Sequence, residues 1–145
     1  MSHQNVSVLE IGLVTLVVRD YDEAIDYYVN TVGFSLIEDT ALGAYKRWVV
    51  VAPSVDARTR LLLAHAATPE QRARIGDQTG GRVALFLYST DFSADHERLS
   101  GAGVRFVEAP RQETYGRVAV FEDLYGNRWD LIESPAVETA RSSRS

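Results

Sequence analysis

The spacing of hydrophobic residues predicts a strand, a helix and three more strands in the first half of the chain. Residues 8–18 (VLEIGLVTLVV) are β-rich and apolar, which predicts a strand buried on most of both faces. Asp20 and Asp22 follow as helix-capping residues, and Gly33 ends the helix. The apolar residues at helical spacing between them are Ala24, Ile25, Tyr28, Val29 and Val32. The three further strands are predicted over 34–38, 45–52 and 60–65.

The second half repeats this order. Asp91 or Ser93 begins a predicted helix that ends near Gly101 or Gly103. The strands are predicted over 82–88, 104–108, 115–122 and 128–133. Asp20 aligns with Asp91, and residues 59–65 align with 127–133, which indicates an internal duplication.

The duplication divides the chain into two βαβββ modules. The expected limits are 8–67 for the first module, 68–81 for a connecting helix and turn, 82–134 for the second module and 135–145 for a frayed tail. Neither half can bury its concave face alone, so we expect the pair to enclose a cleft.

Composition narrows the class of protein. The 145 residues contain no cysteine, which excludes disulfides, thiolate nucleophiles and cysteine-ligated metal sites. The formal net charge of −5 disfavours a nucleic-acid partner. No apolar run approaches the length of a membrane span and the polar start is unlike a signal peptide, so we expect a cytoplasmic protein without a membrane partner. Lys46 is the only lysine among 15 basic residues, which suggests a GC-rich bacterial genome.

Two segments carry a family resemblance. VTLVVRDYDEAIDYY followed by VGF, and FEDLYGNRWDLIE near the C-terminus, resemble the vicinal oxygen chelate superfamily, which contains glyoxalase I, bleomycin-resistance proteins and extradiol dioxygenases. The resemblance spans roughly residues 8 to 134. It implies an α+β fold in which two tandem βαβββ modules form paired half-barrels around a cleft, and it implies a homodimer.

The metal-dependent members of that superfamily hold one divalent ion with His, Gln or Glu side chains from four strands. By resemblance, these positions fall on Leu13, Leu62, Arg82 and Asp130, with Ala84 as the third position if the repeat offset is used instead. Leucine has no lone pair, and the arginine cation repels a divalent ion. Because only Asp130 keeps a donor oxygen, we expect no metal site and no metal cofactor.

Arg82 and Asp130 are the first candidates for ligand binding. If both face the cleft, Arg82 can hold a carboxylate bidentately while Asp130 orients it. The alternative is an internal ion pair at the position of the relatives' metal.

The third strands of the two modules supply further candidates. Arg47, Trp48 and Tyr115 give aromatic or cationic groups that suit a planar or anionic organic ligand. Strand alternation places Arg47 on one face, together with Tyr45 and Val49, and Trp48 on the other, together with Lys46 and Val50.

The histidines are weaker candidates. His65 differs from Leu62 by three positions, so it should point to the opposite face of its strand. His96 is expected on a solvated helix face, and His3 lies near the N-terminus. No catalytic residue is assigned.

Three functions remain open. The first is a cleft that binds a small, planar or anionic organic molecule without metal, as in the bleomycin-resistance branch. The second is a metal-dependent glyoxalase-like lyase, isomerase or dioxygenase with non-standard ligands, such as His65, Glu10 or Glu133 with Asp130. The third is a structural or regulatory module whose own side chains fill the cleft. Whether the chain catalyses a reaction is left open.

Overall fold

The structure is a computed structural model that describes residues 6–135. His3 and almost all of the predicted frayed tail lie outside the described residues.

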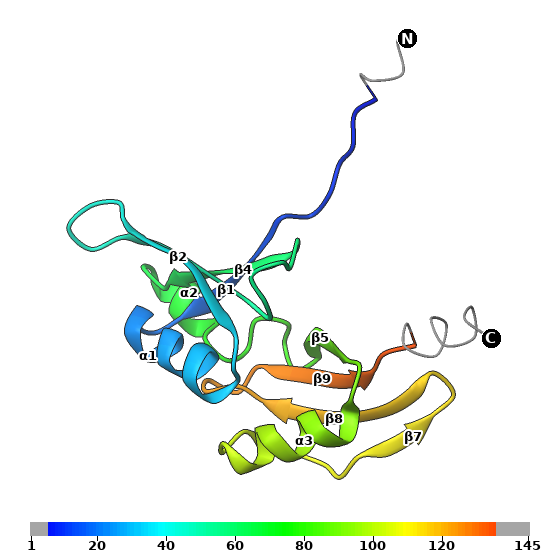
Figure 1. Cartoon of the computed structure of the whole chain (residues 1–145). Coiled ribbons are helices and arrows are strands. Elements are labelled where there is room, and N and C mark those ends of the chain that lie inside the picture. The colour runs from blue at the N-terminus through cyan, green and yellow to red at the C-terminus, as the bar shows by residue number, and fades with distance from the viewer. Residues whose placement is uncertain (1–5, 136–145) are drawn as a thin grey trace.

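The first module forms a four-stranded sheet with the strand order β1-β4-β3-β2. Its strands are β1 (Leu13–Val18), β2 (Ser35–Ala41), β3 (Arg47–Ala52) and β4 (Arg60–His65). β1 is parallel to β4, and the other neighbours are antiparallel. Helix α1 (Tyr21–Ile25) continues into the π-helix η2 (Asp26–Thr31), and the short helix α2 (Pro69–Ala73) follows β4 (Figure 1).

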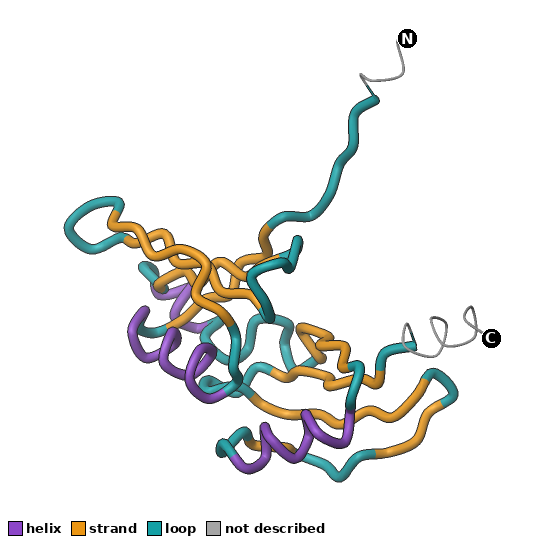
Figure 2. Tube along the Cα trace, in the orientation of Figure 1, coloured by secondary structure: helices purple, strands orange, loops and turns teal. Residues whose placement is uncertain are grey.

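The second module repeats this topology with β5-β9-β8-β6, and β7 pairs with β8. Its strands are β5 (Val83–Ser89), β6 (Arg105–Phe106), β7 (Arg111–Glu113), β8 (Gly116–Glu122) and β9 (Arg128–Glu133), and its helix is α3 (Phe92–Gly101). Again the first strand is parallel to the last. Figure 2 shows the two sheets with their helices. The α+β class predicted from the sequence is confirmed.

A single hydrophobic core joins the two halves. Leu16 and Leu63 from the first sheet belong to one buried cluster with Trp129 from the second. The Tyr28 hydroxyl donates to Asp123 Oδ2 at 2.6 Å, and Trp129 Nε1 donates to the Tyr28 hydroxyl at 3.2 Å. Because the helix-facing sides of both sheets are used in this core, the opposite side of each sheet is left open.

A helix cap matches the sequence prediction, and a tight turn joins the last two strands. Asp20 accepts a hydrogen bond from the Glu23 backbone N–H and caps α1. Gly126 has a φ of 105°, a conformation that side chains disfavour, in the turn between β8 and β9. Asp123 closes that turn, because its Oδ1 accepts from three backbone N–H groups, those of Tyr125, Gly126 and Asn127.

Several predicted boundaries were wrong. The predicted strand 8–18 begins only at Leu13. Residues 6–12 belong to no strand, although the Ile11 and Gly12 carbonyls accept hydrogen bonds from Thr59 and Arg60, and the beginning of this segment extends away from the body (Figure 1). β7 was not predicted, since its residues Arg-Gln-Glu show no apolar alternation. The helix after Asp20 passes into a π-helix from Asp26 onward, which the spacing alone did not distinguish from an α-helix.

No helix among residues 6–135 is both long enough and apolar enough to cross a membrane.

Candidate functional site

The open face of the first sheet carries every second side chain of its strands. Leu62 lies opposite Thr15 of β1 and Val50 of β3, and Val50 lies opposite Glu38 of β2. Trp48 is two residues from Val50, so it shares this face. The intervening residues, such as Leu63, point into the core.

A pocket of about 670 Å³ occupies one end of this open face. Its floor includes Trp48, Leu62 and Ala64, and α2 contributes Gln71 and Arg72 to its wall. The remaining lining residues are Thr15, Tyr21, Tyr45, Lys46, Arg47, Leu63, His65, Ala66 and Ala67. The volume lies within the range of about 300–1,000 Å³ that is usual for small-molecule sites.

The lysine and arginine side chains that line this pocket give it positive charge. Lys46, Arg47 and Arg72 line it, and among residues 6–135 no aspartate or glutamate does. The chain as a whole carries a formal net charge of −5, so this positive lining is opposite in sign to the general balance. Lys46 and Arg72 form no ion pair within residues 6–135.

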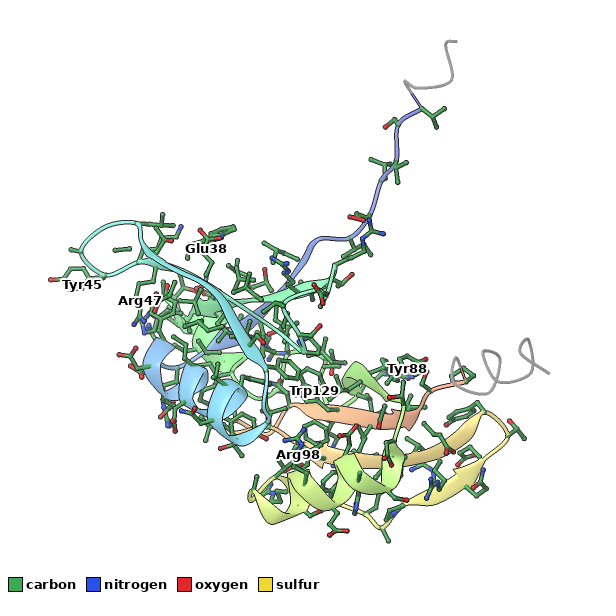
Figure 3. All side chains as sticks on the ribbon, viewed as in Figure 1. Glu38, Tyr45, Arg47, Tyr88, Arg98 and Trp129 are labelled. Carbon is green, nitrogen blue, oxygen red and sulfur yellow. The ribbon has the colours of Figure 1, made fainter. Side chains whose placement is uncertain are left out.

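Arg47, in contrast, is fully engaged by its own chain. Its guanidinium forms ion pairs with Asp39 at 2.7 Å and Asp22 at 2.9 Å. It also lies 5.1 Å from the centre of the Tyr21 ring. The hydrogen bonds that the guanidinium donates to Asp39 and Asp22 raise the pKa of Arg47 above its usual value. Figure 3 shows Arg47 on the side of the β2–β3 hairpin that faces α1. The guanidinium therefore borders the pocket with its charge already neutralised.

His65 follows the predicted alternation. Its ring centre lies 5.6 Å from that of Tyr21, on the helix side of the sheet, whereas Leu62 faces the open side. Because β4 ends at His65, the ring still reaches the rim of the pocket.

Asp130 lies on the open face of the second sheet, opposite Phe86 and Val120. It is 8% exposed, and its Oδ1 has no hydrogen-bond partner within the part of the chain that the structure describes. Burial raises the pKa of Asp130, and the nearby Arg111 guanidinium partly offsets this effect. The second sheet thus holds a buried carboxylate with unused hydrogen-bonding capacity.

The expected pair of Arg82 and Asp130 is not formed. Within residues 6–135 no ion pair joins them, and Arg82 is exposed before the start of β5. The reason is the register: Asp130 pairs with Phe86, four residues beyond Arg82, after an irregularity between Val83 and Leu85. Neither residue lines the first-sheet pocket, nor does Tyr115, which is 54% exposed in the turn before β8.

The four ligand positions implied by the family do not fit a divalent ion. Leu13 and Leu62 offer hydrocarbon, Arg82 offers a cation, and Asp130 alone offers oxygen. Residues 6–135 contain no group of three His, Cys, Asp or Glu side chains arranged to hold a metal. A metal site would need donors that these positions do not supply.

Sequence reasoning missed two features. Arg72 was not a candidate, because the position of α2 beside the open face depends on the path of residues 66–68 rather than on a local pattern. The prediction of a solvated His96 was wrong: its ring lies between Phe92 and Phe106, 5.9 Å and 4.3 Å from theirs, and its Nε2 is buried. The alternation over residues 45–50 did place Lys46 beside Trp48.

Comparison with known proteins places this geometry in a family. The family model of the Glyoxalase/Bleomycin resistance protein/Dioxygenase superfamily matches residues 10–131. An uncharacterized protein of Shewanella frigidimarina is 55% identical over 83% of this chain and 90% of its own length.

Solved structures agree with this match. UcmS2 has a TM-score of 0.77 and 30% identity, covering 88% of this chain and 100% of its own. TnmS3, an antibiotic binding protein from Streptomyces sp. CB03234, has a TM-score of 0.71 and 33% identity, covering 89% of this chain and 98% of its own. The chain therefore belongs to the glyoxalase/bleomycin resistance protein/dioxygenase superfamily.

Proposed function

We propose that the chain binds a small, planar, anionic organic molecule in the first-sheet pocket without a divalent metal. The observation that carries this proposal is a pocket in an acidic chain that is lined by Trp48 and by cations, and by no carboxylate of the described part of the chain.

The physical argument has two parts. The half-buried indole of Trp48 and the side chain of Leu62 give an apolar surface on which a flat ring system can stack. Lys46 and Arg72 have no internal counter-ion among the described residues, so an anionic group of the ligand would supply one. The likeness to TnmS3, an antibiotic binding protein, supports a small organic ligand.

We also propose that the chain is a homodimer. Four apolar side chains of the segment before β1 are 68–95% exposed, namely Val6, Val8, Leu9 and Ile11. On the open face of the second sheet, Phe86 and Tyr88 are 56% and 61% exposed. A second copy offers matching apolar surface for both.

The test compares fluorene-2-carboxylate, which is planar and anionic, with the neutral fluorene-2-methanol by isothermal titration calorimetry. We expect the carboxylate to bind more tightly than the alcohol. The double variant Lys46→Ala/Arg72→Ala should weaken binding of the carboxylate about fivefold, which is the effect expected when two partly exposed ion pairs are lost. The matched control is Arg74→Ala/Arg128→Ala, which removes two exposed cations that do not line the pocket. Equal affinity for both probes, or equal loss in both double variants, would overturn the proposed function.

The metal-free part of the proposal has its own test. Affinity for fluorene-2-carboxylate should be the same with EDTA as with added Zn²⁺, Ni²⁺ or Mn²⁺. Protein purified without chelator should contain no stoichiometric metal by elemental analysis. Stoichiometric metal that is lost on Asp130→Ala would favour the metal-dependent enzyme instead.

A further inference from the structure

A second pocket lies on the same open face, on the other side of Trp48. It has a volume of about 410 Å³, and Trp48 borders both pockets. Its apolar floor is formed by Leu13, Ile37 and Val50. Val50 and Trp48 are alternate residues of β3, so one apolar surface continues from the first pocket into the second.

The second pocket differs from the first in charge. Glu38 and Asp56 line it, and neither has a cation partner within residues 6–135. Figure 3 shows Glu38 on the side of the β2–β3 hairpin opposite to Arg47. The only hydrogen bond to the Glu38 carboxylate in this part of the chain comes from the Thr40 hydroxyl, at 3.2 Å.

The basic residues of the second pocket are already engaged. Arg58 lies 3.6 Å from Glu10, the third carboxylate there. The Arg60 guanidinium donates to the backbone oxygens of Ala57 and Val55, at 2.9 Å and 3.2 Å. The Arg60 guanidinium keeps its positive charge, because its partners are backbone oxygens. The second pocket therefore has three carboxylates against two cations and is negative on balance, whereas the cations Lys46 and Arg72 lie on the other side of Trp48.

We infer that the ligand spans both pockets and is amphoteric. This inference rests on the proposed function and specifies its ligand class: an elongated aromatic system lies on Trp48, its acidic group faces Lys46 and Arg72, and a basic nitrogen at its other end faces Glu38 and Asp56. A ligand with both groups matches the separated charges of this face, whereas a simple anion uses only one end.

The experiment adds a basic group to the probe already used. Binding of 7-(aminomethyl)fluorene-2-carboxylate is compared with binding of fluorene-2-carboxylate by calorimetry, at low and at physiological salt. We expect the amine to tighten binding about fivefold at low salt and less at high salt, because exposed charges are screened. The double variant Glu38→Gln/Asp56→Asn should abolish this gain and leave the affinity for fluorene-2-carboxylate unchanged. The unchanged affinity also shows that the variant is folded.

The control Glu70→Gln/Glu97→Gln removes two exposed carboxylates that border neither pocket, and it should keep the gain. If the amine adds nothing while Lys46→Ala/Arg72→Ala still weakens fluorene-2-carboxylate, this inference is wrong and the proposed function stands. If that double variant has no specific effect on fluorene-2-carboxylate, the proposed function fails as well.

Discussion

At the scale of single residues, Asp130 shows how burial changes a carboxyl group. It is 8% exposed with one oxygen unpaired, and burial raises its pKa above the usual value for aspartate. Glu133, three residues later on the same strand, has the opposite shift: its ion pair and hydrogen bonds with Arg117 lower its pKa. One strand thus carries two carboxyl groups whose ionisation has opposite effects on folding.

The two shifts predict opposite pH dependences. For Asp130 the folded state binds the proton more tightly than the unfolded state, so its contribution to stability falls as pH rises from the unfolded pKa towards the folded one. The Asp130→Asn variant should therefore gain stability relative to the parent protein between pH 4 and pH 7. Urea denaturation at both pH values measures this difference in the free energy of unfolding.

Glu133→Gln is the matched control, because its effect on stability should change with pH in the opposite direction. The contribution of Glu133 is present above its unfolded pKa and is lost as pH falls through the lowered folded value. Glu133→Gln should therefore lower the free energy of unfolding more at pH 7 than at pH 4. The same pH trend in both variants would contradict these assignments.

At the scale of elements, Arg47 ties the β2–β3 hairpin to α1. Its guanidinium reaches Asp39 on β2 and Asp22 on α1, and its backbone N–H donates to the Tyr21 hydroxyl at 3.2 Å. The strand next to the proposed ligand site is thereby anchored from the helix side, which leaves the open side for a ligand.

This anchoring predicts that Arg47 and Lys46 have separable roles. Arg47→Ala removes two ion pairs and a cation–π contact, so it should lower the free energy of unfolding by about 1–2 kcal/mol. Because Asp39 and Asp22 already neutralise its charge, affinity for fluorene-2-carboxylate should change less than twofold. Lys46→Ala should show the reverse pattern. Denaturation and calorimetry on both single variants check this, and a large affinity loss in Arg47→Ala with unchanged stability would refute it.

The elements also show which parts of the molecule could be predicted from sequence. The repeated spacing of apolar residues predicted the two βαβββ modules, because each strand has a core face fixed by residues such as Leu63 and Leu131. The alternation around Trp48 predicted which side chains share its face. In contrast, the separation of Arg82 from Asp130 depends on the register of β5 against β9, in which Asp130 pairs with Phe86 and an irregularity between Val83 and Leu85 adds one residue. No local pattern encodes that shift.

At the scale of the whole molecule, both sheets turn their open faces away from the common core. The segment 6–12 extends beyond the body, with Leu9 95% and Ile11 68% exposed (Figure 1). Such apolar surface is costly for a monomer in water, and the proposed homodimer would cover part of it.

The dimer is tested by sedimentation equilibrium at micromolar concentration. The parent chain should sediment as a dimer, and Leu9→Asp/Ile11→Asp should shift it towards monomer. Leu124→Asp is the control, because Leu124 is 44% exposed in the turn between β8 and β9, remote in sequence from that segment. A monomeric parent protein would disprove the homodimer, and a dimer that tolerates both charges would show that segment 6–12 does not form its interface.

The hydroxyl of Tyr28 connects a helix of the first module to the last turn and last strand of the second. Consequently the internal duplication has not left two autonomous units. If the chain were cut within residues 68–81, the indole of Trp129 would be exposed on one fragment. The Tyr28 hydroxyl of the other fragment would lose its hydrogen-bond partners.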